Sequence, residues 1–365
     1  MQRRSFFAQA AAAAATGTAM AAPAFAQGAP RLSWRMPTSF SRSLQALHGG
    51  AERISRYVAE ATEGRFTIRV FPSGEIVPPF GVLDAVQNRT VECGSTVSYY
   101  YYGKNPALCF DAAVPFGLNA RQMNAWMFKG DGLSLTRELF ATYNILNFPV
   151  GNTGVQMGGW FRREIRTVAD LKGLKMRTAG FAGEVLSRLG VVPQQLPPSD
   201  IYPALEKGTL DAVELVGPYD DEKVGLNQVA RYYYYPGWWE GGPQISLYVN
   251  RDAWNELPRS YQVVLEAACQ AALVETIAAY DAYNGPALRR LLAAGTQLRA
   301  FPREVMDASW DASNQVYREL CDRDPQFKKI YDNYMAFRDS TVPWFRLVEG
   351  SYDQYLAAAL ARGRS

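Results

Sequence analysis

Histidine is almost absent from this sequence, because the 365 residues include only one, His48. A histidine-rich zinc site is therefore excluded, and a serine or cysteine nucleophile that needs a histidine partner would have to use His48 itself. The sequence also lacks a Gly-x-Ser-x-Gly elbow, a P-loop, a Gly-x-Gly-x-x-Gly turn after a strand and a His-Glu-x-x-His pair. These absences favour binding over catalysis.

A large net charge is absent as well. The chain has 38 Lys and Arg residues against 35 Asp and Glu residues, a formal net charge of +3. Two of these charges, Arg3 and Arg4, lie in a segment that we expect to be removed, so the mature chain is almost neutral. A nearly neutral chain binds polyanions poorly, and nucleic acid is not an expected partner.

Cysteine is scarce and shows no metal or redox spacing. None of the four residues forms a Cys-x-x-Cys pair, and each has apolar or helical neighbours. We expect mostly buried free thiols, with a Cys93 to Cys109 disulfide as the alternative. The residues are Cys93, Cys109, Cys269 and Cys321.

The first 26 residues have the features of an export signal. Arg3 and Arg4 precede an Ala-rich apolar stretch that ends in Ala24-Phe25-Ala26. The stretch is weakly apolar for a membrane anchor, and the paired arginines are similar to those of a twin-arginine signal, with a Sec signal as the alternative. No later segment offers a long uncharged apolar run. We therefore expect a mature protein in the periplasm of a Gram-negative cell.

The hydrophobic pattern alternates between the periods of strands and helices. Residues 31–36 and 66–70 alternate like strands, and the apolar residues from Leu44 to Ala61 recur every three or four positions, as in an amphipathic helix. His48 lies beside this apolar stripe, which predicts a structural histidine. Further along, Asn119 and Gln122 have the spacing of a helix capping box. This order predicts an α/β domain with a mainly parallel sheet.

The second half of the chain repeats the alternation. We expect a strand over residues 154–161, a short helix over 168–171, a strand over 174–177 and a helix over 183–189. A weak internal echo relates the halves, because Ala85-Val86 and Thr90-Val91-Glu92 align at one offset with Ala204-Leu205 and Thr209-Leu210-Asp211. In open α/β sheets, strand ends that follow such helices line the ligand crevice.

The C-terminal third is predominantly helical. Asn250 should cap a short helix, and residues 258–294 should form a very long helix that is kinked or split at Pro286. The last helix carries an apolar stripe from Tyr352 to Leu360, which needs the protein body or a second subunit to cover it.

Polar residues gather at predicted strand ends of the second half: Asn152, Gln156, Arg177, Glu214 and Glu240. In this setting the sequence resembles the DctP-type solute-binding proteins of tripartite ATP-independent periplasmic (TRAP) transporters, and within them the subgroup that binds 2-oxo or 2-hydroxy acids with a metal ion. The segments that carry the resemblance are Arg69-Val-Phe-Pro-Ser-Gly-Glu-Ile76, Val114-Pro-Phe-Gly-Leu118, residues 167–177, residues 205–212, Gly217-Pro-Tyr-Asp-Asp221 and residues 250–258.

The resemblance implies a fold and a domain organisation. The fold is a two-lobed α/β structure of the type II periplasmic-binding-protein kind, with a ligand cleft between the lobes and long C-terminal helices. Lobe I comprises residues 27–150 and about 243–280, and lobe II comprises residues 151–242 and about 281–345. Residues 346–365 form a C-terminal helix that is a candidate dimerisation element.

The resemblance also implies roles for the polar residues. Arg177 would bind the ligand carboxylate, because a guanidinium presents paired donors in the geometry of a carboxylate. Gln156, Glu214, Glu240 and the main-chain carbonyl of Leu215 are hard oxygen ligands that suit Na⁺ or Ca²⁺. Buried together, two glutamates and an anionic ligand against one arginine would need a cation.

Further ligand contacts are expected from Gln156, Asn152 and Leu215, and from the run Tyr99 to Tyr102, in which we single out Tyr101 and Tyr102. Relatives often carry Trp where this chain has Leu215, so its pocket for the ligand tail should differ.

The leading hypothesis is a periplasmic receptor, a homodimer, that binds a 2-oxo or 2-hydroxy acid such as a lactate-like ligand and delivers it to TRAP membrane permease subunits. An exported metal-dependent enzyme acting on such acids is the alternative, and a sensor subunit with the same fold is a third. No residue in the sequence resembles a general base or a nucleophile with its partner near this site, so we expect no enzymatic activity.

Overall fold

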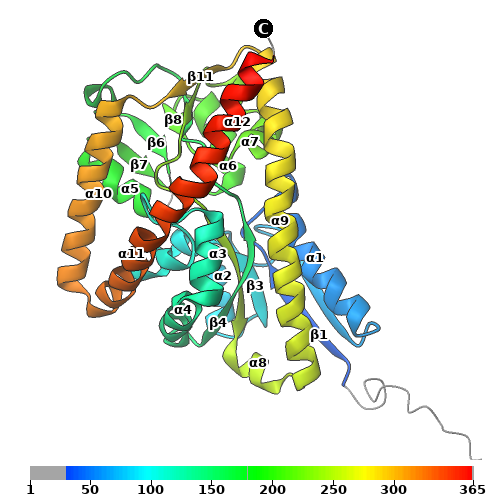
Figure 1. The fold of residues 1–365 in the computed structure, drawn as a ribbon. Helices are drawn as coiled ribbons and strands as arrows, with labels where there is room; N and C mark the ends of the chain where they lie inside the picture. The colour runs from blue at the N-terminus through cyan, green and yellow to red at the C-terminus, as the bar shows by residue number, and fades with distance from the viewer. Residues whose placement is uncertain (1–29, 179, 364–365) are drawn as a thin grey trace, which may run out of the picture. The chain divides into compact units, whose positions relative to one another are not determined.

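The computed structural model describes residues 30–178 and 180–363, so the export signal predicted for residues 1–26 lies outside the described residues. From Leu32 onward the chain forms one unit with several sheets (Figure 1). Its first pair of strands, β1 (Leu32–Pro37) and β2 (Phe66–Phe71), is parallel and is connected by α1 (Gln45–Ala61). The expected strands and amphipathic helix of this segment are therefore confirmed.

His48 has the structural place that its position on α1 predicted. Its side chain is buried, and Nδ1 lies 3.4 Å from the Thr38 hydroxyl. Burial lowers the pKa of His48, against the opposing effect of the Glu52 carboxylate. A neutral, packed imidazole is the result.

The three-stranded sheet corrects the expectation of mainly parallel pairing. Its order is β3 (Cys93–Thr96), β10 (Gln244–Asn250) and β4 (Ile145–Asn152), and β10 is antiparallel to both neighbours. Every residue of β10 is buried. The residues of β10, Gln244-Ile-Ser-Leu-Tyr-Val-Asn250, alternate like those of a strand. This local pattern does not indicate which strands it pairs with, because both partners lie far away in the sequence.

The larger sheet has six strands and mixed direction. Two parallel groups flank the antiparallel strand β5, which begins only at Gly159, so the strand expected from residue 154 is shorter than predicted. In spatial order the strands are β11 (Gln297–Ala300), β9 (Tyr232–Tyr235), β5 (Gly159–Phe161), β8 (Ala212–Val213), β6 (Lys175–Arg177) and β7 (Val192–Gln194).

The internal echo corresponds to a repeated turn. After α2 (Val82–Gln87), the main-chain N–H groups of Thr90 and Val91 donate to the carbonyl of Ala85 at 2.8 and 3.3 Å. After α6 (Pro198–Glu206), those of Thr209 and Leu210 donate to the carbonyl of Ala204 at 3.1 and 3.3 Å. Each turn leads directly into a strand, β3 or β8. The two halves therefore use the same passage from helix to strand.

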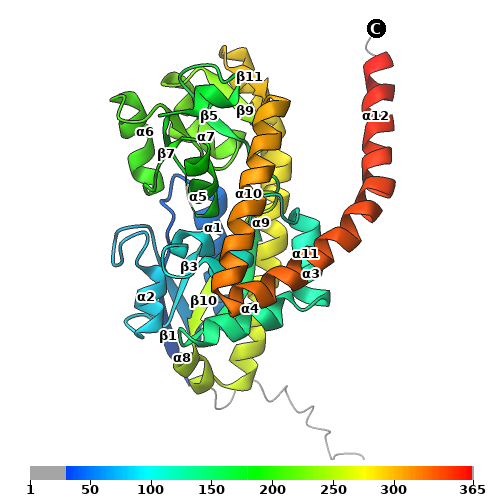
Figure 2. The same cartoon turned by 90° about the vertical axis from the view of Figure 1, so that its left-hand side faces the viewer.

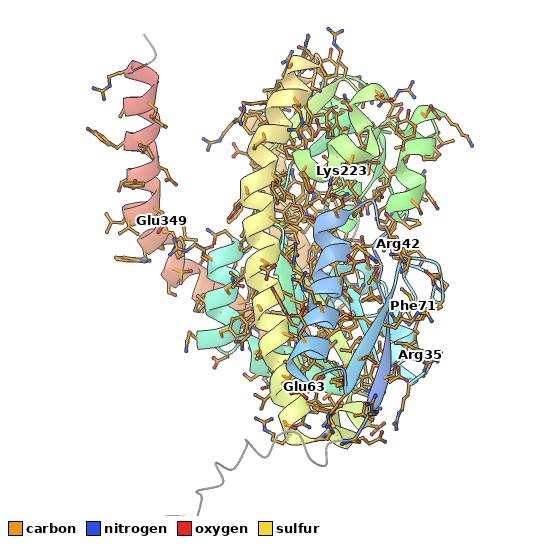
Figure 3. All side chains as sticks on the ribbon, turned by 90° about the vertical axis from the view of Figure 1, so that its right-hand side faces the viewer. Arg35, Arg42, Glu63, Phe71, Lys223 and Glu349 are labelled. Carbon is orange, nitrogen blue, oxygen red and sulfur yellow. The ribbon has the colours of Figure 1, made fainter. Side chains whose placement is uncertain are left out.

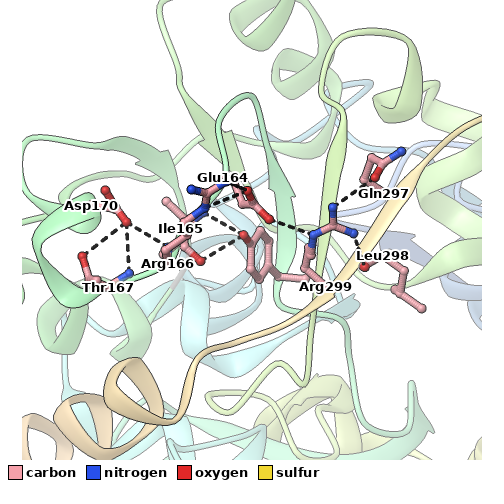
Figure 4. Close-up of polar contacts among 9 residues, drawn as sticks. Glu164, Ile165, Arg166, Thr167, Asp170, Gln297, Leu298 and Arg299 are labelled. Carbon is pink, nitrogen blue, oxygen red and sulfur yellow. Dashed lines mark hydrogen bonds and ion pairs between the residues drawn. The ribbon is translucent and has the colours of Figure 1, made fainter.

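Local capping signals are confirmed at several helix starts. Asn119 and Gln122 form the predicted capping box of α3 (Ala120–Lys129), and Asn250 caps α8 (Arg251–Glu256). Thr167 and Asp170 form a capping box for the short 3₁₀ helix η3 (Val168–Leu171) (Figure 4). The remaining helices of this part are α4 (Gly132–Ala141), α5 (Phe181–Arg188) and α7 (Pro218–Val224).

The loop before η3 is fixed to the edge of the six-stranded sheet. The Glu164 carboxylate accepts from Arg166 at 2.6 Å and from Arg299, on β11, at 2.9 Å (Figure 4). The Asp170 carboxylate accepts from the main-chain N–H groups of Arg166 and Thr167. These contacts hold the segment that leads into β6 and Arg177.

Helix α9 (Arg259–Ala293) is the long helix that the sequence predicted. It runs through Pro286 as a single helix, so it is not split there, and it packs against α1, β4 and α7. Among the described residues it is the one helix long and apolar enough to cross a membrane by length and composition, a test that core helices also pass. Its contacts and its buried face are those of a core helix.

The chain ends in α10 (Arg303–Arg323), α11 (Pro325–Phe345) and α12 (Ser351–Arg362). A π-helical turn over Arg346–Gly350 separates the last two helices, and Figure 2 shows α12 projecting away from the sheets. Figure 3 labels Glu349 at the base of α12, where it pairs with Arg121 at 2.5 Å. No residue of α12 is buried.

The cysteines are free thiols, as expected, and the alternative disulfide between Cys93 and Cys109 is not formed. Three of them are buried, whereas Cys321 is half-buried. Burial raises the pKa of the Cys93 thiol, so this group is an inert core side chain.

Candidate functional site

Arg177 and Glu214 meet at one edge of the six-stranded sheet. Strands β6 and β8 are parallel, with Arg177 beside Val213, so Glu214 follows β8 next to the end of β6. Arg177 Nη1 lies 3.0 Å from Glu214 Oε2 and donates to the Glu214 main-chain carbonyl at 2.5 Å. Arg177 Nε donates to the carbonyl of Leu196 at 3.2 Å. The arginine is 2% exposed and the glutamate 0%, so this is a fully buried ion pair.

A second buried carboxylate, Glu240, lies close to this pair. Burial raises the pKa of Glu240 well above its usual value, and the negative charge of Glu214 raises it further. Burial also raises the pKa of Glu214 to about 7, although Arg177 opposes the rise. One guanidinium therefore faces two buried carboxylates, and the ligand-free site is short of positive charge.

The loop that carries Gln156 is joined to the loop that carries Glu240. The Gln156 main-chain N–H donates to the Glu240 carbonyl at 3.1 Å, and the Gly237 N–H donates to the Gln156 carbonyl at 2.9 Å. A Cβ on Gly237 would lie 2.7 Å from the Met157 carbonyl oxygen, so the approach requires glycine. Gln156 is thereby placed beside Glu240.

Three oxygens of this group lack a hydrogen-bond partner within the described part of the chain. They are Gln156 Oε1, Glu214 Oε1 and Glu240 Oε2, each on a buried side chain. Buried acceptors without partners are costly, and a hard cation such as Na⁺ or Ca²⁺ would satisfy all three. Across residues 30–178 and 180–363 no three His, Cys, Asp or Glu side chains cluster as a metal site, so an amide or a carbonyl must complete any such set.

Leu215 and Val216 continue the chain beyond Glu214. Both side chains are buried, and the Val216 carbonyl accepts from the Met157 N–H at 3.2 Å. The Leu215 main chain is therefore held beside the Gln156 loop. This position is compatible with the expected carbonyl ligand.

Asn152 has its side chain bonded to the main chain. Its Nδ2 donates to the Gly242 carbonyl at 2.8 Å, and its Oδ1 accepts from the Gly154 N–H at 2.9 Å. These bonds connect the loop of Gln156 with the loop of Glu240. The ligand contact expected of Asn152 stays a prediction, and in this structure its side chain holds the two loops together.

The four tyrosines of the run have different surroundings. The Tyr101 hydroxyl accepts from the Leu83 N–H and is hydrogen-bonded to the Thr96 hydroxyl. The Tyr102 ring packs edge-on against the Phe181 ring, with 5.4 Å between ring centroids. By contrast, the Tyr99 hydroxyl interacts with the carboxylate of Glu240, and this interaction opposes the rise of the Glu240 pKa.

Tyr100 belongs to the same group as Tyr99. Burial raises the pKa of Tyr100 to about 12, while the nearby Arg177 guanidinium opposes the rise. In the 3₁₀ helix η1 (Ser98–Tyr101), successive side chains point in different directions, so only part of the run can face the site. The tyrosines beside Glu240 and Arg177 are Tyr99 and Tyr100, while the ligand contacts expected of Tyr101 and Tyr102 stay predictions.

Two polar atoms that the sequence analysis did not select lie next to the site in sequence. Thr178 Oγ1 follows Arg177 and Trp239 Nε1 precedes Glu240, and neither atom has a hydrogen-bond partner among the residues described. Both are donors on buried side chains. Their adjacency to Arg177 and Glu240 was the only signal in the sequence that could have indicated them.

The chain is similar to known proteins over nearly its whole length. The model of the bacterial extracellular solute-binding proteins, family 7 (DctP), matches residues 39–324. A monocarboxylate 2-oxoacid-binding periplasmic protein of Nostoc sp. is 51% identical over 332 residues, which cover 91% of each chain.

Solved structures give the same result. A TRAP transporter solute-binding protein from Bordetella bronchiseptica matches with a TM-score of 0.90 and 53% identity over 92% of this chain and 99% of that one; it is a mixed-occupancy dimer with copurified calcium and picolinate in one active site and an apo second site. A protein from Pseudoalteromonas atlantica with bound sodium and pyruvate matches with a TM-score of 0.86 and 36% identity over 89% and 99%. A protein from Colwellia psychrerythraea with bound calcium and pyruvate matches with a TM-score of 0.87 and 35% identity, over 89% of this chain and 99% of that one.

Proposed function

Because this chain belongs to family 7 of the bacterial extracellular solute-binding proteins, we propose that it binds a small 2-oxo monocarboxylate together with Na⁺ or Ca²⁺ and delivers it to the membrane subunits of its transporter. The protein is a periplasmic TRAP solute-binding protein and not an enzyme. The observation that carries the proposal is the group of three unpartnered buried oxygens beside a buried arginine.

Different residues bind the anionic ligand and the cation. Arg177 binds the ligand carboxylate, while Gln156, Glu214, Glu240 and the Leu215 carbonyl hold the cation. The cation supplies the positive charge that two buried glutamates and an anionic ligand require. Glu214 contacts both groups, because its Oε2 accepts from Arg177 Nη1 and its Oε1 is left to bind the cation.

The ligand class follows from the need to contact both Arg177 and the cation. A 2-oxo acid presents a carboxylate oxygen and a keto oxygen on neighbouring carbons, so it can contact the arginine and chelate a cation at the same time. Picolinate, found in the Bordetella relative, offers a ring nitrogen beside its carboxylate in the same arrangement. Both ligands share the pattern of a carboxylate with an electron-pair donor at the adjacent carbon.

We place the ligand between two lobes and a dimer contact at the C-terminus. The proposed lobe I comprises residues 27–150 and about 243–280, and lobe II residues 151–242 and about 281–345. The pairing of β10 with β3 and β4 supports this division. The exposed helix α12 is the proposed dimerisation element, supported by the dimeric Bordetella relative.

Glu240→Gln tests the cation role with two opposite expected effects. The substitution keeps the size of the side chain but removes a carboxyl group whose ionisation burial opposes, so the protein without ligand should melt at a higher temperature at neutral pH. Cation and 2-oxo acid affinity should each fall at least about tenfold, because each stabilises the charge of the other. Calorimetry and thermal melts measure both effects.

The control is Glu256→Gln, which alters an exposed glutamate on α8 that pairs with Arg89 and should change neither property. Full ligand affinity in wild-type protein dialysed against chelator and Na⁺-free buffer would contradict the cation role. Native mass spectrometry of the protein as purified identifies a retained acid and cation directly.

Leu215 tests the size of the tail pocket. If leucine leaves more apolar space than the tryptophan of relatives, each added methylene of the ligand contributes up to about 0.8 kcal/mol. We therefore expect 2-oxobutyrate and 2-oxoisovalerate to bind at least as tightly as pyruvate in a competition series, with Leu215→Trp reversing the order. A steady loss of affinity from pyruvate upward, or an unchanged order in the variant, would refute this geometry.

A further inference from the structure

A third buried carboxylate, Asp111, lies outside the proposed site and receives an unusual number of hydrogen bonds. It is 0% exposed, at the end of the 3₁₀ helix η2 (Pro106–Asp111). Its Oδ2 accepts from the hydroxyls of Ser98 and Ser246, the latter at 2.7 Å. Its Oδ1 accepts from the side-chain amides of Asn147 at 2.7 Å and Gln244 at 3.2 Å.

These donors compensate the buried charge. Burial raises the pKa of Asp111 to about 6, and the four side-chain donors oppose that rise. A carboxylate that accepts from several fixed donors holds each of them in place, because moving one leaves a buried acceptor unsatisfied. Asp111 therefore fixes the segments from which its donors come.

The donors come from three segments that lead to the proposed ligand site. Ser98 is the first residue of η1, which carries Tyr99 and Tyr100, and its Oγ also accepts from the Tyr248 hydroxyl at 2.6 Å. Gln244 opens β10 four residues after Glu240. Asn147 lies on β4, which ends at Asn152.

Of the three segments, η1 depends most on a side-chain anchor. Strands β4 and β10 are held by their main-chain ladder, whereas η1 is a single short turn between β3 and a loop. Besides the bond from Tyr248 to Ser98, the Tyr101 hydroxyl accepts from the Leu83 N–H at 3.2 Å. The Gln195 side-chain amide donates to the Tyr100 carbonyl at 3.1 Å. A shift of this turn would move Tyr99 and Tyr100 away from Glu240 and Arg177.

We propose that Asp111 is a positioning residue for ligand binding, which acts through Ser98 to hold Tyr99 and Tyr100 against Arg177 and Glu240. The proposal rests on the function proposed above for the site. Asp111 itself touches neither the ligand nor the cation. It works by fixing the turn that closes one side of the site.

Ser98→Ala is the decisive variant, because it removes the bond between η1 and Asp111 while Asp111 keeps its donors from Ser246, Asn147 and Gln244. We expect the affinity for pyruvate, measured by calorimetry at saturating cation, to fall about fivefold or more. Asp111→Asn should give a similar or larger loss. Ser313→Ala is the matched control: it removes an equally buried hydroxyl, bonded to the Ser309 carbonyl at 2.7 Å, and should leave affinity within about twofold.

A double-mutant cycle separates positioning from a general loss of stability. If Ser98 acts through Tyr100, the double variant Ser98→Ala with Tyr100→Phe should bind pyruvate about as weakly as the weaker-binding single variant. The two losses of affinity should therefore be clearly non-additive. Additive losses, or wild-type affinity in Ser98→Ala, would overturn the positioning role of Asp111 and leave the proposed function intact. A wild-type chain that binds no 2-oxo acid would overturn the proposed function, and this inference with it.

Discussion

At the scale of single residues, Arg177 is the one cation of a buried site that holds two carboxylates. Its guanidinium already bonds Glu214 through Nη1 and Leu196 through Nε, so its plane is fixed before any ligand arrives. Such pre-orientation reduces the entropy that binding must lose. It also makes the arginine part of the structure of the site.

We expect Arg177→Ala to lower the affinity for 2-oxo acids by at least about tenfold, because truncating one partner of a buried charge pair typically costs about 2–5 kcal/mol. The substitution also leaves Glu214 buried without its counter-charge, so the protein should be less stable at neutral pH. Calorimetry and thermal melts measure the two effects. Arg177→Lys should be impaired as well, since an ammonium cannot form the paired bonds. Arg299→Ala, at the sheet edge, is the control, and unchanged ligand affinity in Arg177→Ala would remove this residue from the site.

The raised pKa of Glu214 gives the site a pH dependence. Between the usual carboxyl range and about 7, the folded ligand-free protein holds a proton that the unfolded chain has lost, so its stability should fall as the pH rises through this window. A cation needs the deprotonated carboxylate, so its affinity should rise over the same window. Melts and cation titrations from pH 5 to about 8 measure these opposite trends. Glu214→Gln should weaken both trends, and parallel trends in the wild type would contradict the assignment.

At the scale of elements, the short strand β5 determines where Glu214 lies. Gly159 opens β5 with a φ of +95°, and a Cβ there would lie 2.3 Å from the Val213 carbonyl oxygen and 3.1 Å from Glu214 Cα. Only glycine permits both the left-handed backbone and this close approach to β8. The pairing of β5 with β8 therefore depends on this position.

Gly159→Ala should destabilise the protein by roughly 2–4 kcal/mol and weaken cation binding, because the strand must move away from Glu214. Denaturant unfolding and cation titration measure the two losses. Gly64→Ala is a suitable control, since Gly64 also has a positive φ of +71° but no atom within 4 Å of an added Cβ. The control should lose only about 1 kcal/mol and keep its cation affinity. Equal losses in both variants would show that backbone strain alone is responsible.

At the scale of the whole molecule, α12 presents an apolar face that nothing else in the described chain covers. Tyr352, Tyr355, Leu356 and Leu360 are 66%, 72%, 41% and 58% exposed. A helix that buries no side chain gains little from its own protein body, so we expect a partner subunit to supply the packing.

We expect a chain that ends at residue 350 to become monomeric while each site keeps its ligand affinity, because α12 lies outside the proposed site. Sedimentation or light scattering over a range of concentrations measures the change. Since truncation also removes chain length, Tyr355→Asp with Leu360→Asp provides a second disruption of the same face. A truncated chain that stays dimeric, or a full-length chain that is monomeric at every concentration, would reject this dimer contact.

The sequence by itself determined the features that depend on neighbours along the chain. Periodicity located α1, and a run of helix-forming residues with few breakers located α9. Capping residues such as Asn119 and Asn250 marked helix starts, and the echo of residues 85–92 in 204–211 marked two equivalent turns. The identities of Arg177, Glu214 and Glu240 came from the same source, because strand ends and motifs are local. These signals concern spacing over a few residues, which the chemistry of the chain fixes before folding.

Only the tertiary structure decided which groups meet. The pairing of Arg177 with Glu214 depends on the register of two strands far apart in the chain. The position of β10 between β3 and β4 also depends on distant segments, which its own alternating pattern does not identify. Four consecutive tyrosines are equivalent in sequence, and packing alone brings Tyr99 and Tyr100 beside Glu240 and Arg177. The physical reason is that burial and pairing are properties of the assembled fold, since each depends on atoms contributed by distant segments.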